Sequence, residues 1–313
     1  MSKRRIILAG GKGFLGHVIA RHLEPRGWEP VLLTRKPSSN RSFKELAWDG
    51  KSLGDWAKTL EGAEAIINLT GRSVNCRYNA ENRREIMDSR VDSTRVMGEA
   101  IAQCQGPPRV WLNCSTATIY KHTFGPPHDE SSIDFDSAIG AKDAFSVSVA
   151  LAWEKTFNEA HTPQTRKVAL RTTIVFGTVE DGVFRILRRL SKFGLGGRMG
   201  SGRQFVSWIH EDDFARAVEW VLEHDVLSGP VNMASPNPLT NAEMMRIVRG
   251  VCGIPLGLPA TEWMLEAGAV VMRTETELLL KSRNVVPGRL LASGFKFQYP
   301  SFEEAIRELE IRV

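Results

Sequence analysis

The stretch Ala9-Gly10-Gly11-Lys12-Gly13-Phe14-Leu15-Gly16 decides the fold of this chain. It follows a short apolar run, Arg5 to Ala9, and opens a segment, Phe14 to Arg26, with apolar residues at three- and four-residue spacing. A strand, a glycine turn and a helix in this order let the backbone approach a pyrophosphate at the helix N-terminus. We therefore expect a dinucleotide site, although a purely structural tight turn is the alternative. The cofactor contacts that this loop predicts are Gly10, Gly13, Phe14, Leu15 and Gly16.

The sequence around this stretch alternates short apolar runs with amphipathic segments up to about residue 175, which is typical of βαβ units. Strands are expected at Arg5 to Ala9, Pro30 to Thr34, Glu45 to Trp48, Ala65 to Thr70, Arg109 to Cys114 and Val168 to Arg171. Helices are expected at Phe14 to Arg26, Ala80 to Gln103 and Asp143 to Ala160. The pattern predicts an α/β fold of the Rossmann type, with a doubly wound parallel sheet.

Beyond residue 175 the alternation weakens, and helical segments separated by Gly- and Pro-rich loops follow. These helices are expected at Gly182 to Phe193, Glu211 to Glu223, Asn241 to Val251, Ala260 to Ser282 and Ser301 to Ile311. We predict a Rossmann domain over 1–175, to which a segment of about 204–234 returns. A smaller, mainly helical and discontinuous domain over 176–313 is expected to form a substrate cleft.

The end of the second expected strand carries a sign of cofactor preference. It reads Thr34-Arg35-Lys36, where an NAD-specific protein would usually place an acidic residue on the ribose 2′-hydroxyl. A cation at this point suits a 2′-phosphate instead. The three residues therefore predict contacts with NADP(H), against the alternative of a solvated charge pair at a strand end.

The amino-acid composition limits the kinds of partner that this chain is expected to bind. The charge of +5 comes from 41 basic and 36 acidic residues that are interspersed, which argues against a nucleic-acid surface. The four cysteines form no CxxC pair, and no apolar run is long enough to span a membrane. We expect a cytoplasmic protein with a small-molecule substrate, without nucleic-acid or membrane partners, and with a homodimer as one possible assembly.

Several motifs together resemble a known family. They are the glycine loop, Ile66 to Gly71, Ser89-Arg90-Val91 with Thr94, Cys114 to Tyr120, Trp153-Glu154, Gly200 to Gln204, Ser207 to Asp213, Pro230 to Asn232, Pro287 to Leu290 and Gly294-Phe295. With them the chain resembles an atypical extended short-chain dehydrogenase/reductase of the sugar-nucleotide-epimerase-like family with a C-terminal domain of unknown function. The resemblance implies further cofactor contacts at Leu69, Thr70, Gly71, Ser89, Ser115 and Thr173, of which Ser89 would lie near the ribose and Thr173 near the nicotinamide.

The resemblance also implies a catalytic arrangement that this chain has only in part. Active members of the superfamily use a Ser or Thr after the fifth strand and a Tyr-x-x-x-Lys pair, in which a cation lowers the tyrosine pKa. Thr116 fits the first role, but the chain contains no Tyr-x-x-x-Lys, and the corresponding helix reads Phe145-Ser-Val-Ser-Val149. Tyr120 is the candidate replacement as proton donor, and packing beside the substrate is its alternative role.

Two further patterns bear on substrate and metal. Nucleotide-sugar enzymes of the superfamily tend to hold the diphosphate with an Arg where this chain has Val206, although Arg198 and Arg203 are nearby. His210 with Asp212 and Asp213 matches a strand-to-helix junction, so we predict a capping role and no metal site.

We therefore predict an NADP(H)-dependent oxidoreductase or epimerase-like enzyme that acts on an unidentified small carbonyl or carbinol compound. The alternative is a non-catalytic NADP(H)-binding sensor or interaction protein that lacks the Tyr-x-x-x-Lys pair.

Overall fold

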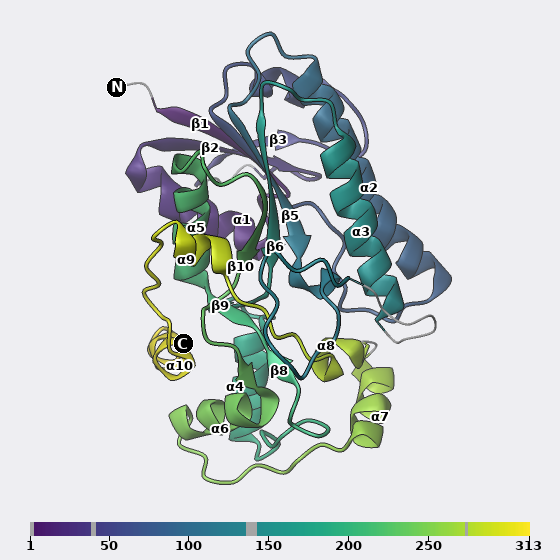
Figure 1. The fold of residues 1–313 in the computed structure, drawn as a ribbon, viewed down its shortest axis with the longest axis vertical. Coiled ribbons are helices and arrows are strands. Elements are labelled where there is room, and N and C mark those ends of the chain that lie inside the picture. Colours follow the sequence, from purple (N-terminus) through teal and green to yellow (C-terminus); the bar gives the residue numbers. More distant parts are fainter. Residues whose placement is uncertain (1–2, 39–41, 136–142, 273–274) are drawn as a thin grey trace.

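A parallel sheet of seven strands organises the larger part of the molecule (Figure 1). The computed structural model describes residues 3–38, 42–135, 143–272 and 275–313. The strands are β1 (Arg4–Ala9), β2 (Trp28–Thr34), β3 (Lys44–Ala47), β4 (Ala65–Asn68), β5 (Val110–Thr116), β6 (Arg166–Thr172) and β10 (Gly229–Met233). Their order is β10-β6-β5-β4-β1-β2-β3, and each neighbouring pair is parallel. The predicted α/β fold with a Rossmann-type sheet is confirmed.

Helices cover both faces of this sheet. α2 (Ala80–Ala102) and α3 (Ala144–Glu159) pack together on one face, while α1 (Phe14–Leu23) and α5 (Glu211–Glu223) pack on the other (Figure 1). Strand β1 shows why the strands are apolar throughout. Ile6 and Leu8 are buried under α1 and α5, and Ile7 and Ala9 are buried in the core on the side of α2 and α3.

The direction in which strands are added reverses beside β1. From β1 the chain builds outward through β2 and β3, and then returns to place β4, β5, β6 and β10 on the other side of β1. In open α/β sheets such a reversal leaves a crevice at the carboxyl ends of the strands, where ligands bind. The glycine loop after β1 lies at this position.

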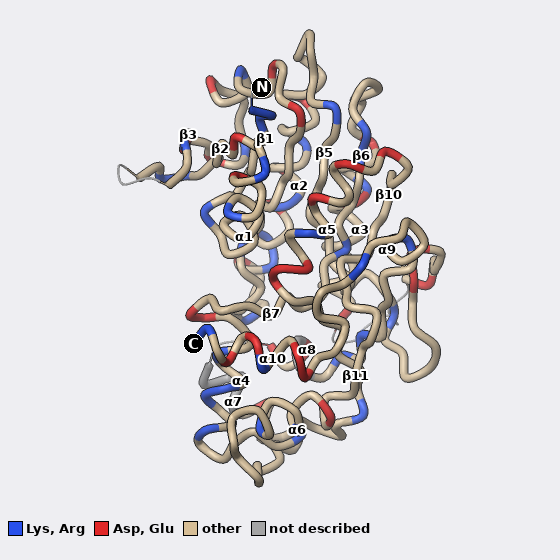
Figure 2. Tube along the Cα trace, turned by 90° about the vertical axis from the view of Figure 1, so that its left-hand side faces the viewer, with Lys and Arg blue, Asp and Glu red and all other residues tan. Residues whose placement is uncertain are grey.

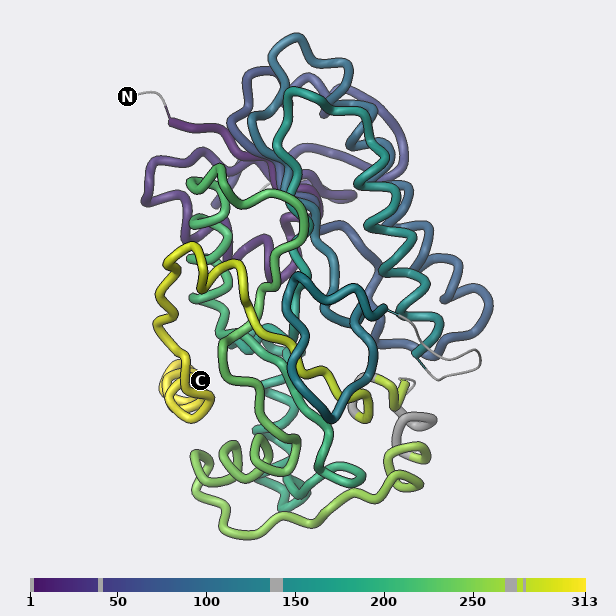
Figure 3. The backbone as a smooth tube through the Cα atoms, viewed as in Figure 1, coloured from purple at the N-terminus to yellow at the C-terminus, as the bar shows by residue number. Residues whose placement is uncertain are grey.

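The remaining elements form a smaller part around a core of their own. Its helices are α4 (Val183–Lys192), α6 (Asn241–Val251), α7 (Glu262–Met272), α8 (Glu277–Leu280) and α10 (Phe302–Ile311), as Figure 3 traces. The short helix α9 (Gly288–Ala292) packs instead on β10 and adds Leu290 to the core of the main sheet. Two short pairs, β7 (Ile174–Phe176) with β9 (Trp208–His210) and β8 (Phe205–Val206) with β11 (Leu239–Thr240), accompany them. The 3-10 turns are η1 (Glu24–Arg26), η2 (Asp55–Leu60) and η3 (Ala117–Ile119).

One expected helix is broken. Ala260 to Ser282 was expected to be continuous, but the structure has α7 and α8 there as separate helices. Thr276 precedes α8 and donates its hydroxyl to Glu266 of α7, at 2.9 Å, which holds the two helices together. After α8 the backbone at Lys281 is extended, so the chain leaves the helix and runs toward the end of β5.

Charge is spread over both parts of the molecule. Figure 2 shows Lys and Arg interspersed with Asp and Glu along the whole trace. Among the described residues, no helix combines the length and the apolar character that crossing a bilayer requires.

Candidate functional site

The glycine loop makes a close turn between β1 and α1. Gly10 has φ of +73°, and a Cβ on it would lie 3.1 Å from the carbonyl carbon of Leu69 after β4. A Cβ on Gly16 would lie 2.4 Å from the Gly11 oxygen, so the first turn of α1 packs directly on the loop. Only glycine meets both conditions without displacing backbone. The loop is thereby held against the carboxyl ends of β1 and β4.

The N-terminus of α1 is open to a ligand. Gly13 precedes the helix, and no side-chain hydrogen bond among the described residues caps it. The first intrahelical bond of this turn is that of the His17 N–H to the Gly13 oxygen, so the N–H groups of Phe14, Leu15 and Gly16 have no partner within the helix. N–H donors at a positive helix end are suited to a phosphate. The predicted contacts of the loop therefore lie together at the crevice.

Thr70 faces this loop from the end of β4. Its N–H donates to the Asn68 side chain at 3.1 Å, whereas its hydroxyl oxygen is buried without a hydrogen-bond partner among the described residues. A buried hydroxyl without a partner is unfavourable, unless a ligand supplies the bond. Together with the close approach at Gly10, this orphaned hydroxyl fits a nucleotide bound across the loop.

The end of β2 carries the predicted cations. Arg35 and Lys36 are exposed, and Arg35 forms no ion pair or hydrogen bond with the residues that the structure describes. Lys12 of the glycine loop donates to the Lys36 carbonyl oxygen at 3.1 Å and lies 3.7 Å from the Glu45 carboxylate. Lys12 was not among the predicted contacts, but it adds a third cation at this end of the crevice.

The next predicted contacts, Gly71 and Ser89, belong to a loop tied to α2. The Ser89 hydroxyl accepts from the Arg72 N–H at 2.9 Å and donates to the Ile86 carbonyl oxygen at 3.2 Å. A Cβ on Gly71 would lie 3.2 Å from the Arg90 guanidinium carbon. In the structure, Ser89 thus positions the loop after β4.

Ser115 and Tyr120 lie inside the protein. The Ser115 hydroxyl donates to Glu154 at 2.6 Å, and Arg171 forms two bonds to the same carboxylate, at 2.9 and 2.8 Å. The Tyr120 hydroxyl accepts from Arg171 and donates to Asn232, both at 2.9 Å. Tyr120 is only 2% exposed, and its burial raises the pKa of the phenol. Ser115 and Tyr120 therefore belong to a buried hydrogen-bond network, and their hydroxyls do not lie open at the carboxyl edge of the sheet.

Thr116 and Thr173 lie at the carboxyl edge of the sheet. Thr116 ends β5 opposite Thr172 of β6, and its hydroxyl accepts from the Thr118 N–H at 3.1 Å. The Thr173 hydroxyl donates to the Met233 carbonyl oxygen at 2.8 Å and so joins the ends of β6 and β10. Both residues are half-buried. Thr116 keeps the position predicted for a hydroxyl that contacts substrate.

A polar cluster lies at the start of α3, where a Tyr-x-x-x-Lys pair was expected and is absent. The Ser146 hydroxyl donates to Glu277 of α8 at 2.7 Å. The Tyr78 ring packs edge-on against Phe145, with centroids 5.1 Å apart. Burial raises the pKa of both Tyr78 and Glu277. Sequence reasoning missed this cluster because its members come from three distant segments.

The cluster borders a cavity of about 200 Å³. The lining residues are Tyr78, Arg83, Glu266, Glu275, Thr276 and Glu277. The segment after α8 is tied to the loop after β5, because Lys281 donates to the Thr118 carbonyl oxygen at 2.8 Å and Arg283 to the Thr118 hydroxyl at 3.3 Å. Figure 3 shows this yellow-green segment beside the loop after β5. The cavity therefore lies between the start of α2 and the residues of α7 and α8.

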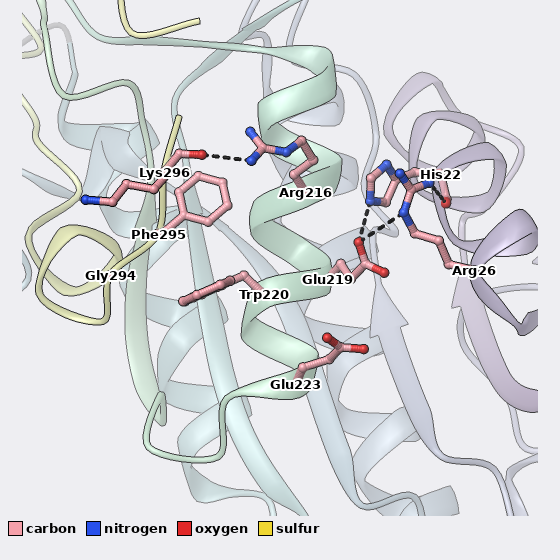
Figure 4. A pocket seen from close by; sticks show the side chains of 9 residues that line it. All are labelled: His22, Arg26, Arg216, Glu219, Trp220, Glu223, Gly294, Phe295 and Lys296. Atoms are coloured by element: carbon pink, nitrogen blue, oxygen red, sulfur yellow. Dashed lines mark hydrogen bonds and ion pairs between the residues drawn. The ribbon is translucent and has the colours of Figure 1, made fainter. Parts of the chain in front are cut away.

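A second hollow, of about 300 Å³, lies elsewhere (Figure 4). It is lined by His22, Arg26, Arg216, Glu219, Trp220, Glu223, Gly294, Phe295 and Lys296. His22 lies in the last turn of α1 and Arg26 in η1 directly after it, roughly 15 Å from the N-terminus of α1 at the usual helical rise. This hollow is separate from the crevice at the glycine loop.

The residues around His210, where β9 meets α5, cap the helix and hold neighbouring backbone. His210 caps α5 by accepting the Asp212 N–H at its Nδ1 atom, at 3.1 Å, and burial lowers its pKa to about 4. Asp213 accepts from the N–H groups of Gln298 and Tyr299, at 2.8 and 2.7 Å. Val206 is buried in β8, and Arg198 donates to the carbonyl oxygens of its own loop.

Comparison with known proteins covers nearly the whole chain. The model of the NAD dependent epimerase/dehydratase family matches residues 6–234, and a domain of unknown function (DUF1731) matches residues 260–309. Epimerase family protein SDR39U1 of Bos taurus is 31% identical over 97% of this chain and 99% of its own length. Epimerase family protein YfhF of Bacillus subtilis is 28% identical, with 97% of each chain covered.

Solved structures show the same fold. The crystal structure of human epimerase family protein SDR39U1 (isoform 2) with NADPH has a TM-score of 0.87 at 28% identity, covering 99% of this chain and 100% of that one. A nucleoside-diphosphate sugar epimerase from Corynebacterium glutamicum has a TM-score of 0.77 at 24% identity, covering 98% of this chain and 58% of that one. The second likeness concerns the fold alone.

Proposed function

Because this chain belongs to the NAD dependent epimerase/dehydratase family, we propose that it binds NADP(H) and interconverts a carbonyl and a carbinol group of a small substrate. The orphaned hydroxyl of Thr70, a residue whose Cα lies against the glycine loop, carries the proposal. The NADPH held by the similar human protein supports the choice of cofactor. A cytoplasmic location and a homodimer stay expectations.

Different residues of the crevice bind different parts of the cofactor. The free N–H groups of Phe14, Leu15 and Gly16 bind the pyrophosphate, and Gly10 lets it approach the backbone. Arg35 and Lys36, with Lys12 beside them, bind the 2′-phosphate. Thr70 would donate its hydroxyl to the ribose or to a phosphate of the cofactor. Leu69 and Gly71 line the same wall, while Ser89 and Thr173 position the loops behind it.

The residue that assists the proposed reduction lies at the carboxyl end of β5. Bound NADPH provides the hydride that a carbonyl carbon accepts. Thr116 donates its hydroxyl to the carbonyl oxygen, which becomes more negative as the carbon is reduced. Ser115 and Tyr120 hold β5, β6 and α3 in place from inside.

A non-catalytic NADP(H) sensor is the second candidate. The observation that favours it is the start of α3, where Phe145 and Val149 stand in place of the Tyr and Lys of the expected pair. Such a protein would bind the cofactor with the same residues but would not turn it over.

One experiment distinguishes the two candidate functions. The purified chain is titrated with NADPH and NADH by nicotinamide fluorescence, and is then incubated with NADPH and a panel of small aldehydes, ketones and quinones together with a metabolite extract. We expect tighter binding of NADPH and a fall in reduced-nicotinamide absorbance, with a matching carbinol in the mass spectrum. Tight binding without turnover on any compound would support the sensor. Absence of NADPH binding would contradict both.

A further inference from the structure

Glu45 is a charged residue on the edge strand of the sheet, but its side chain has little contact with solvent. It lies in β3 opposite Leu32 of β2, and this parallel register turns both side chains to the face that α1 covers. The Glu45 side chain is only 9% exposed. A carboxylate buried to this degree needs charged or hydrogen-bonding partners. The partners of Glu45 come from the two segments that carry the cations of the crevice.

The first partner is the segment that follows β2. Ser38 donates its N–H to Glu45 Oε2 at 2.7 Å and its hydroxyl to Glu45 Oε1 at 3.3 Å. The shorter of these distances is typical of a hydrogen bond to a charged acceptor. Ser38 lies two residues beyond Lys36, so Glu45 anchors the backbone that carries Arg35 and Lys36.

The second partner is Lys12, which reaches over from the glycine loop. Its ammonium nitrogen lies 3.7 Å from Glu45 Oε2 and donates to the Lys36 carbonyl oxygen at 3.1 Å. An ammonium group has three N–H donors, so these two contacts leave a further donor for a ligand. The Lys12 side chain is also 38% exposed, which leaves this donor accessible.

We propose that Glu45 is the positioning residue of the 2′-phosphate site, which holds Lys12 and the segment with Arg35 and Lys36 in place before the cofactor arrives. This inference rests on the proposed function. Cations gathered in one place repel one another, and a carboxylate beside Lys12 offsets part of that repulsion. Long cationic side chains lose conformational entropy when they are ordered, so a site that is assembled in advance binds phosphate more tightly.

A purely structural role for Glu45 is the alternative. An inward-pointing charge on an edge strand discourages pairing with other chains, and β3 is such a strand. This role would not distinguish NADPH from NADH, because the two cofactors differ only in the 2′-phosphate. The proposed role concerns that phosphate alone, so it affects the affinity for NADPH and leaves the affinity for NADH almost unchanged.

Electrostatics gives the test a definite sign. A carboxylate near the 2′-phosphate repels it, so removal of the carboxylate from a site that kept its shape would strengthen NADPH binding. Weaker NADPH binding after removal of Glu45 therefore means that the positions of the cations matter more than the lost repulsion.

The test measures the dissociation constants of NADPH and NADH by nicotinamide fluorescence, for the full chain and its variants. We expect Glu45→Met to weaken NADPH binding about tenfold and NADH binding less than about twofold. Glu45→Gln keeps an oxygen that accepts the Ser38 N–H, so its loss of NADPH affinity should be smaller, about threefold. Glu29→Met removes an equal charge from the exposed start of β2 and should change neither constant.

Two nucleotides repeat the comparison without the nicotinamide. Adenosine 2′,5′-bisphosphate and AMP differ only in the 2′-phosphate, and calorimetry measures the binding of each. Glu45→Met should weaken binding of the bisphosphate about tenfold and leave that of AMP within about twofold. If Glu45→Met does not fold, the same comparisons with Glu45→Gln decide, by the direction of the change.

A double-mutant cycle tests whether Glu45 acts through Lys12. Lys12→Met alone should weaken NADPH binding about fivefold, because it removes one cation from the phosphate. In the Glu45→Met background the same change should cost less than about twofold, because Lys12 is no longer held in place there. Equal costs of Lys12→Met in both backgrounds would show that Glu45 does not position Lys12, and would overturn the proposal.

The remaining outcomes separate this inference from the proposed function. Unchanged or tighter NADPH binding by Glu45→Met, when the unaltered chain prefers NADPH, would overturn the role of Glu45 alone. Equal losses for NADPH and NADH would do the same, since they indicate a general structural role. An unaltered chain that binds NADH as tightly as NADPH would instead overturn the 2′-phosphate site of the proposed function.

Discussion

Arg171 and Glu154 form a two-pronged ion pair between β6 and α3, with nitrogen to oxygen distances of 2.9 and 2.8 Å. Both side chains are almost fully buried, and the pair also holds the hydroxyls of Ser115 and Tyr120. Removing one partner would leave a buried charge without compensation. The pair therefore fixes the position of β5, on which the carboxyl edge depends.

Arg171→Met should lower the free energy of unfolding by about 3 to 5 kcal/mol, since it leaves Glu154 buried and unpaired. Urea unfolding of the unliganded chain measures this. The double variant Arg171→Met with Glu154→Leu is the matched control and should recover much of the loss. A double variant no more stable than Arg171→Met would contradict the explanation.

Arg35→Glu should weaken NADPH binding about tenfold or more and affect NADH binding much less, because only NADPH carries the 2′-phosphate. Fluorescence titration with both cofactors checks this. Arg21→Glu, an equal charge change on the exposed side of α1, controls for the overall field. Equal losses for both cofactors in Arg35→Glu would show that Arg35 does not contact the phosphate.

Thr70→Val removes the orphaned hydroxyl at nearly constant volume. We expect the unliganded chain to gain up to about 1 kcal/mol of stability, because a buried group without a partner is lost, while NADPH affinity falls several-fold. Thermal unfolding and fluorescence titration are the two measurements. Thr173→Val provides the contrast, since its hydroxyl is bonded to Met233 and its loss should reduce stability. A Thr70→Val protein with unchanged affinity would remove Thr70 from the cofactor site.

Gly10→Ala should cost about 1 to 3 kcal/mol and abolish measurable NADPH binding, because the residue has a positive φ and its new Cβ would approach the Leu69 backbone. Gly27→Ala separates the two effects, since Gly27 has φ of +84° and open space around it. It should show the strain of a positive φ alone and keep its affinity. Equal effects of both variants on binding would argue against a close approach at Gly10.

The stability of the chain should fall as the pH is lowered below about 6.5, and His210 should cause part of this fall. Its pKa in the folded chain, about 4, lies below its ordinary value. As the pH falls, the unfolded chain is therefore protonated first, and this lowers its free energy relative to that of the folded chain. The contribution is complete above pH 6.5 and is lost progressively toward pH 4. Urea unfolding of the unaltered chain and of His210→Asn, which keeps a capping side chain, should show a shallower pH dependence in the variant. Parallel pH profiles would exclude His210 as a source.

The sequence was sufficient for features that depend on neighbouring residues. The glycine loop, the cations after β2 and the strand pattern each lie within one short segment, so their geometry follows from local rules. Ser115 was harder to place, because successive side chains of a strand alternate in direction and the sequence does not say which of them faces the interior. Tyr120 follows η3, and its surroundings depend on distant residues, because only the fold shows that Asn232 and Arg171 enclose its hydroxyl.

Other features depend on contacts between distant segments. Tyr78, Ser146 and Glu277 belong to a loop, the start of α3 and α8, and nothing in their local patterns links them. The hydrogen bond from Thr276 to Glu266, which joins α8 to α7, is a contact that periodicity alone does not reveal. The division into domains at residue 175 remains a prediction.

The segment that carries Glu277, Lys281 and Arg283 belongs to the region matched by the domain of unknown function, whereas the nucleotide crevice is built from the first 90 residues. The two can therefore diverge separately in evolution. Exchange of residues 260–309 between relatives would leave the nucleotide-binding residues of the recipient chain unchanged. It would replace the wall that α7 and α8 give to the cavity near Tyr78. In an engineered hybrid of this kind, cofactor preference would be inherited from one parent and substrate choice from the other.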